Sequence, residues 1–260
     1  MHDTQPAAID DALARSVVYH ALSVSFQMPT EVGLVRIGAR AGFPILVAAL
    51  EQLDGRSGPG SLASAAAGVR AVSVPGVDAL ASVFVRLFGH TARGLVCACE
   101  AEYGPDTGFQ QPQQLADISG YYLAFGLQPI AASDTRLDHI ACECEFMDFL
   151  NRKQAVLLAD LKPSPDRRDT LAATEQAERT FLRDHLGRFG RAFAARAADA
   201  DADGYFGVFG RVLLGLIETE CARVGIRADP VELVVSPDTP DETPMMCGTA
   251  DELIQIQRSR

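Results

Sequence analysis

The sequence predicts an all-α protein, folded as an irregular bundle of roughly eight to ten helices. Apolar residues recur at three- and four-residue spacings through most of the chain, which is the period of a helix. The alternation that marks strands is confined to short pieces such as residues 231–235. With 260 residues, of which 48% are hydrophobic and 22% charged, the chain can bury a core without disulfides.

The first helical pattern covers residues 10–26, and Pro29 then ends it. Further helices are expected over residues 31–53, 77–102, 113–125, 137–160, 170–197 and 205–224. Clusters of turn-forming residues separate them at 54–61, 104–112, 128–136 and 162–169. The last cluster is either a hinge between two helical lobes or a surface loop inside one domain.

These boundaries predict one helical domain over residues 1–228 and an extended acidic tail over residues 229–260. Four prolines between positions 230 and 244 favour extended backbone in the tail. The longest apolar run, residues 43–50, is far shorter than the roughly 20 residues of a membrane-spanning helix. Residues 1–11 contain no Lys or Arg, so no secretory signal is expected. A cytoplasmic location with reduced thiols follows as the expectation.

The net charge of −11 argues against nucleic acid as a partner, because phosphate backbones are bound by Lys and Arg. Residues 94–151 carry nine carboxylates, and Arg136 is the one Lys or Arg among them. Two interpretations fit this density of acids. It is either a solvated acidic surface that favours solubility, or a surface that attracts a basic peptide.

Enzyme signatures such as GxSxG, HExxH, GxxxxGK and GxGxxG are absent from the sequence. A hydrolase that assembles Ser, His and Asp from distant positions is kept only as a residual alternative. Asp199, Asp201, Asp203 and Gly204 match the opening of a calcium loop, D-x-D-x-D-G. Gly210 stands where such a loop needs its bidentate carboxylate, so an acidic turn between helices is favoured.

Cysteine is the candidate metal ligand, in two CxC pairs and two single positions. The proposed set is Cys97, Cys99, Cys142, Cys144 and Cys247, for zinc or an iron–sulfur cluster. Because both pairs fall in helical pattern, residues two apart would point away from one another and could not chelate as a unit. Burial of these cysteines as small apolar residues is the commoner alternative.

Two further segments place carboxylates densely on apolar helices, which predicts a polar groove between helices. They comprise Glu100, Glu102, Tyr103 and Gly104, and then Asp138, His139, Ile140, Glu143, Glu145, Phe146 and Met147. Asp138 and His139 stand at an expected helix start. Asp138 is therefore either a simple cap that accepts backbone N–H bonds or part of a binding site.

These segments, taken together with two others, resemble the TorD-like redox-enzyme maturation chaperones. The other two are residues 114–126 with Tyr121, Tyr122 and Phe125, and a weaker first-helix match from Arg15 to Pro29. The Glu-Tyr-Gly and Leu-Ala-Asp pieces resemble the subgroup that serves type II enzymes of the dimethyl sulfoxide reductase family. Unlike several members of the family, this chain has no Trp, and it has Cys99 and Cys144 where close relatives more often show aromatic or aliphatic residues.

The resemblance implies a non-enzymatic, all-helical cytoplasmic chaperone, a monomer or homodimer that requires no cofactor. Its partner would be the apo catalytic subunit of a molybdopterin oxidoreductase, together with any twin-arginine signal peptide. Two guanidinium groups followed by an apolar stretch would suit acids beside an apolar groove. The expected client-binding residues are Glu100, Glu102, Tyr103, Tyr121, Phe125, Asp138, His139, Glu143 and Met147, with His139 tuning the site by titration. A cysteine-ligated metal protein of the same maturation pathway is the alternative.

Overall fold

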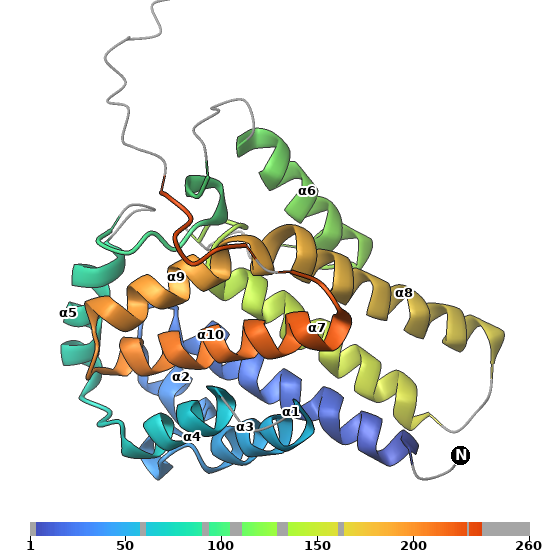
Figure 1. Cartoon of the computed structure of the whole chain (residues 1–260), viewed down its shortest axis with the longest axis horizontal. Coiled ribbons are helices and arrows are strands. Elements are labelled where there is room, and N and C mark those ends of the chain that lie inside the picture. Colours follow the sequence, from blue (N-terminus) through green and yellow to red (C-terminus); the bar gives the residue numbers. More distant parts are fainter. Residues whose placement is uncertain are drawn as a thin grey trace, which may run out of the picture.

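A computed structural model describes residues 4–57, 61–89, 94–104, 111–128, 135–160, 164–227 and 229–235, and helices account for most of them (Figure 1). In chain order the longer helices are α1 (Thr4–Ser25), α2 (Glu31–Arg36), α3 (Pro44–Ser57), α4 (Ser61–Ala71), α5 (Val77–Phe88), α6 (Gln111–Ala124), α7 (Ile140–Ala159), α8 (Pro165–Phe181), α9 (Gly187–Ala200) and α10 (Tyr205–Val224). Short turns of helix are η1 (Ala39–Ala41), η2 (Glu100–Glu102) and η3 (Leu182–Leu186). The predicted all-α fold is confirmed.

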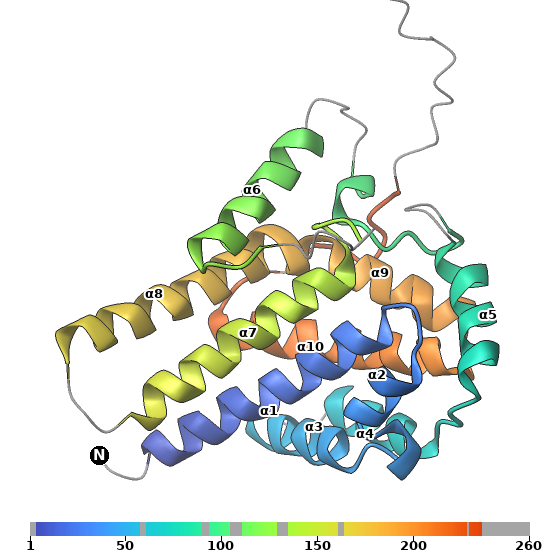
Figure 2. The same ribbon diagram turned by 180° about the vertical axis from the view of Figure 1, so that it is seen from behind.

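The α1–α7 pair forms the largest contact between two elements, and the α9–α10 pair is the next largest. Helices α3 and α4 pack against α1 and α10, while α8 packs along α7 (Figure 2). Phe26, Phe88, Phe193 and Phe206 meet edge to face or stacked in the core between these helices. Such aromatic contacts add to the burial of apolar area that stabilises the bundle.

The helix expected over 77–102 is wrong in its second half. α5 ends at Phe88, and Gly89 has a φ of 76°, a left-handed conformation that favours glycine. Cys99 then lies in extended backbone and forms an antiparallel bridge with His139. Because this bridge supplies hydrogen bonds from a distant segment, it replaces the helical bonds that the apolar spacing predicts.

Two other predicted helices are interrupted. The 31–53 segment breaks at Gly38 and Gly42, both with positive φ, so that α2 and α3 are separate helices. The 170–197 segment contains a π-helical turn, η3, between α8 and α9. Helix α4 was not predicted at all, because its run of small residues lacks a strong apolar stripe.

Several local predictions are confirmed. The helix over 205–224 is observed as α10, and Gly225 closes it with a φ of 66°. In the acidic turn before it, Asp201 Oδ2 accepts a hydrogen bond from the Phe206 N–H at 3.0 Å, which caps the helix. Among the described residues, no helix is both long and apolar enough to cross a membrane.

The first residues of the predicted tail lie against the body. The Gly104 N–H donates to the Val234 carbonyl at 2.9 Å, and Arg196 donates to the Leu233 carbonyl at 2.7 Å. The remainder of the tail, from residue 236, and residues 161–163 of the candidate hinge lie outside the described residues. The division at residue 228 therefore stays a prediction.

Candidate functional site

Four of the carboxylates singled out in the sequence gather beneath α6. Glu100 and Glu102 come from η2, Asp138 precedes α7, and Glu143 stands in its first turn. Their exposed fractions are 0%, 4%, 0% and 0%. The Cys99–His139 bridge brings the two segments together, with the Glu100 N–H donating to the Asp138 carbonyl at 2.9 Å. These four side chains are called the acidic cluster below.

Arg136 occupies one side of the acidic cluster. Its Nε and Nη2 donate to the two carboxylate oxygens of Asp138 at 3.0 and 2.8 Å, and its Nη1 donates to Glu102 Oε1 at 2.8 Å. Burial opposes the charge of Arg136, but the hydrogen bond to Glu102 and the charge of Asp138 raise its pKa above the usual range. This fork geometry is the one in which Arg binds carboxylates most strongly.

A second set of contacts comes from η3 and α9. His185 Nδ1 lies 3.0 Å from Glu100 Oε2, while its Nε2 lies 3.2 Å from Asp117 Oδ2 on α6. Arg188 Nε lies 3.9 Å from Glu100 Oε1. His185 and Arg188 are not among the site residues predicted from the sequence. Their spacing of three residues, which places both on one helix face, was the available signal.

Glu143 is a fully buried carboxyl of the acidic cluster. Burial raises its pKa well above the usual range, and the charges of Glu100 and Asp138 and a hydrogen bond to Glu100 raise it further. A neutral Glu143 can donate its proton to Glu100, which relieves part of the repulsion. The acidic cluster thus holds more carboxyl groups than nearby cations.

Helix α6 packs an aromatic face on α7 and α8, next to the acidic cluster. Tyr121 packs edge to face on Phe181, and Phe125 packs on Phe146 of α7. The Tyr122 hydroxyl donates to the Leu137 carbonyl at 3.0 Å. In both views α6 lies at the edge of the bundle, above the ends of α7 and α9 (Figures 1 and 2). Apolar surface of α7 and α8 therefore lies near the acids, and α6 packs on that surface.

The role expected of His139 is only partly met. Its Nδ1 accepts the Ala141 N–H at 3.2 Å, so His139 is the N-cap of α7. Asp138 instead accepts the Ala101 N–H at 3.0 Å, across the bridge. Burial, with a smaller contribution from the charge of Arg136, lowers the pKa of His139 to about 4. The imidazole is neutral near pH 7, which does not fit tuning of the site by titration.

Two further residues of the expected set have side chains held by core contacts rather than by the carboxylates. The Tyr103 hydroxyl donates to the Cys97 carbonyl at 2.7 Å, and its ring packs on Phe189 and beneath the guanidinium of Arg196. Met147 is fully buried in the core. Of the predicted set, the structure brings together Glu100, Glu102, Asp138 and Glu143. Tyr121 packs on His185, the partner of Glu100, and Phe125 packs on Phe146 and Phe149 of α7.

The cysteines are dispersed rather than clustered. Cys97 and Cys99 lie outside the helices, with Cys99 in extended backbone, so the helical geometry expected of this pair is wrong. Burial raises the pKa of Cys142 to about 12 and that of fully buried Cys144 well above its usual value, which disfavours the metal-binding thiolates. In the described part of the chain, no three His, Cys, Asp or Glu side chains are grouped to hold a metal. Cys247 lies outside the described residues.

A second buried ionic cluster provides a contrast. Arg15 lies 3.9 Å from Glu178 and 3.8 Å from Glu220, and Arg223 lies 3.0 Å from Glu178. Gln154 donates to Glu178 at 3.1 Å. Two arginines here balance two acids and join α1, α8 and α10. This cluster is electrostatically complete, whereas the acidic cluster beneath α6 has an excess of carboxyls.

Comparison with known proteins gives one family match. The family model described as nitrate reductase delta subunit matches residues 58–195, which is more than half of the chain. That range contains all four carboxylates of the acidic cluster, α6, and the cations Arg136, His185 and Arg188. No curated protein and no solved structure matches the chain.

Proposed function

Because the chain belongs to the nitrate reductase delta subunit family, which consists of TorD-like chaperones of molybdoenzyme maturation, we propose that it holds the unfinished catalytic subunit of one molybdopterin oxidoreductase. The chaperone keeps that subunit open while the cofactor is inserted. Where the client is exported, it also binds the client's twin-arginine signal peptide. The acidic cluster is the site that we assign to the arginines.

One observation supports this assignment most directly. Glu102 and Asp138 already hold a guanidinium, that of Arg136, with three hydrogen bonds of 2.8–3.0 Å. Arg136 is about one-third exposed, whereas both acids are almost fully buried. In this proposal the guanidinium of Arg136 occupies the position in which an arginine of the client binds. The client's arginine takes its place from the solvent side.

The second arginine and the apolar stretch of the signal peptide need separate subsites. Glu100 and Glu143 lie beside the Arg136 subsite, and the buried Glu143 shares a hydrogen bond with Glu100. Tyr121 and Phe125 of α6, with Phe146 below them, offer apolar surface next to these acids. In this proposal α6 moves to admit the peptide, and Tyr103 and Met147 support the walls of the site.

The assignment is tested by titrating the full chain calorimetrically with the signal peptide of a molybdoenzyme encoded beside its gene. Loss of a charge-assisted hydrogen bond is worth about 1.5–3 kcal/mol. We therefore expect Glu102→Gln and Asp138→Asn to weaken binding by about tenfold or more. Glu145→Gln, an exposed acid on the same helix as Glu143, is the matched control and should bind as the wild type does.

Arg136→Gln separates a binding role from a structural one. If the client's arginine replaces Arg136, removing this competitor should tighten peptide binding, even though the folded state loses an ion pair. A peptide in which both arginines are lysines should gain less, because lysine cannot form the fork. Unchanged affinity for all three site variants, in samples that fold as the wild type does, would refute the assignment.

A further inference from the structure

A cavity of about 370 Å³ opens between α1, α2 and α3, on a part of the molecule that the acidic cluster does not reach. Its walls are mostly apolar and include Val17, Ile37 and Leu46. This volume lies within the range of pockets that bind ligands or anchoring side chains. All of its lining residues except Arg152 lie outside residues 58–195, so the family match says nothing about it.

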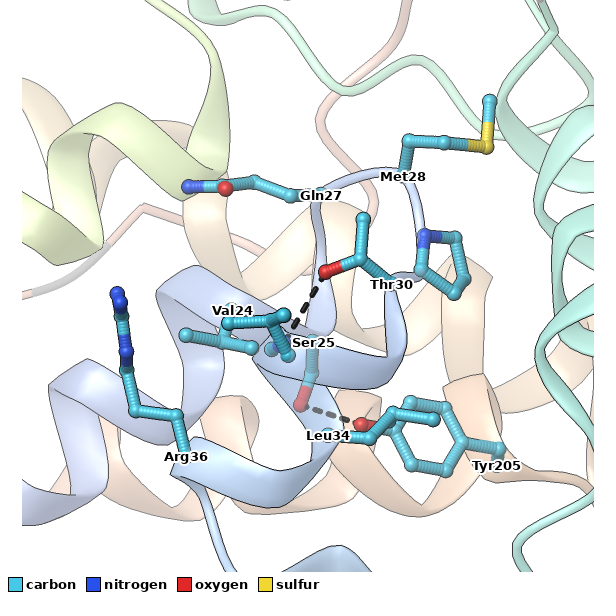
Figure 3. Close-up of a pocket in the computed structure, with 11 residues that line it drawn as sticks. Val24, Ser25, Gln27, Met28, Thr30, Leu34, Arg36 and Tyr205 are labelled. Atoms are coloured by element: carbon cyan, nitrogen blue, oxygen red, sulfur yellow. Dashed lines mark hydrogen bonds between the residues drawn. The ribbon is translucent and has the colours of Figure 1, made fainter.

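Apolar surface continues beyond the cavity. Val35 and Ile45 line its mouth and are 61% and 71% exposed. Val32, 69% exposed, and Met28 line a neighbouring cavity of about 150 Å³ at the α1–α2 turn (Figure 3). The two cavities and these four side chains are called the α2 corner. Contiguous exposed apolar surface of this kind marks interaction sites on soluble proteins.

The charged residues lining the α2 corner are basic. Arg36 lines both cavities and forms no ion pair within the described part of the chain. Figure 3 shows its guanidinium extending away from the other labelled side chains. Arg152 lines the larger cavity and is held in place by Asp148, which is nearly buried. Glu31, the nearest exposed acid in α2, is paired with Arg40 at 2.9 Å.

We propose that the α2 corner docks an amphipathic helix of a partner protein, with apolar residues on one face and carboxylates beside them. The apolar side chains enter the cavity between α1 and α3, and a carboxylate pairs with Arg36. Although the chain has a net charge of −11, no Asp or Glu is among the described residues that line the two cavities. A basic segment would therefore find no carboxylate to pair with there, so its binding is disfavoured. The apolar surface outside the cavity favours a polypeptide over a small anion.

The chain would thereby carry two sites that prefer ligand groups of opposite charge. The acidic cluster attracts arginine, whereas the α2 corner attracts carboxylates. The inference about the α2 corner does not depend on the proposed role of the acidic cluster, since it uses different residues. Binding at two separate sites on one client would raise the overall affinity through effective concentration.

The probe is a fluorescein-labelled 18-residue helical peptide with Leu at helical spacing and Glu along one flank, titrated into the full chain by anisotropy. A matched peptide has Lys at each Glu position. We expect the Glu peptide to bind at least tenfold more tightly at low salt. Ile45→Ser and Arg36→Glu should each weaken it severalfold, and Arg227→Glu, at an exposed unpaired arginine elsewhere, should not.

Equal affinity for the Glu and Lys peptides, or unchanged affinity of Arg36→Glu, would overturn the proposal. Light scattering that shows a dimer dissociated by Ile45→Ser would assign the corner to a second copy instead. Tighter peptide binding after deletion of residues 236–260 would assign it to the chain's own tail. None of these results alters the titration with a twin-arginine peptide, so the two proposals fail independently.

Discussion

At Glu143, burial and the charges of neighbouring acids both oppose ionisation of the side chain. It is fully buried, and its neighbours Glu100 and Asp138 are acids. A carboxyl in this position is tolerated because it stays protonated. The arrangement destabilises the folded state whenever Glu143 ionises.

This predicts a pH-dependent effect of Glu143→Gln. The raised pKa of Glu143 contributes stability that is fully present below its unfolded value of about 4.5 and is lost as pH rises through the folded pKa. Gln cannot ionise, so the variant should be more stable than the wild type at pH 8, with the difference vanishing towards pH 4. Urea unfolding across this range measures it. If exposed Glu145→Gln gives the same pH dependence, the explanation is wrong.

His139 predicts the opposite dependence. Its folded pKa of about 4 lies below the ordinary 6.5, so the stability it contributes is present above pH 6.5 and is lost as pH falls towards 4. His139→Asn keeps a favoured N-cap and removes the titration, so it should reduce the loss of stability in this window. An NMR titration of the imidazole with a midpoint near 6.5 would contradict the burial on which this rests.

At the scale of elements, the α9–α10 crossing is sensitive to side-chain size. A Cβ on Gly210 would lie 2.8 Å from the Ala194 carbonyl oxygen and 2.9 Å from the Ala198 nitrogen, which are backbone atoms that cannot move aside. Gly68 in α4 has only Val208 Cγ1 at 3.8 Å, an ordinary contact. Both glycines lie inside helices, and only one of them is required by packing.

Gly210→Ala should therefore lower the free energy of unfolding by about 1–3 kcal/mol, because overpacking separates the two helices. Gly68→Ala should raise it by up to about 1 kcal/mol, because Ala is the better helix former and the space is available. Thermal unfolding of both variants, followed by circular dichroism, measures the sign of each change. Two changes of the same sign would show that this crossing is looser than the structure indicates.

α6 is the element whose attachment bears on access to the acidic cluster. It contacts the body through its aromatic face, the Tyr122–Leu137 bond and Gln111, which donates to the Ala101 carbonyl at 3.2 Å. α7, by contrast, is buried between α1 and α8. We expect amides of α6 to exchange with deuterium well before those of α7. Exchange in α6 as slow as in α7 would argue against its displacement by a peptide.

At the scale of the whole molecule, the distribution of thiols bears on the metal alternative. Cys97 and Cys99 are buried near η2, while Cys142 and Cys144 lie in α7. The pKa values of all four thiols are raised, and burial is the largest cause. Metal binding needs thiolates that converge. We therefore predict that an anaerobically purified sample contains well below one iron or zinc per chain by elemental analysis. One metal per chain, lost in Cys99→Ser, would restore the alternative.

Much of the candidate site was predictable because its chemistry is local in sequence. Glu100, Glu102, Asp138 and Glu143 stood out as acids within apolar segments, and their resemblance to a known family identified them together. Two of the cations that contact them did not stand out. His185 and Arg188 lie more than 80 residues from Glu100 along the chain, and no spacing rule joins them. The α2 corner was missed because an exposed Val or Ile has the same sequence pattern as a buried one.

The amino-acid sequence alone determined the all-α class, most helix positions and the concentration of acids, because helical period and charge are properties of neighbouring residues. The tertiary structure decided that α5 stops at Phe88, since a bridge to His139 satisfies the backbone that follows. It also decided that four of the acids are buried, two of them against Arg136, rather than exposed to solvent. Burial and ion pairing depend on which distant segments meet, and local periodicity carries no information about that.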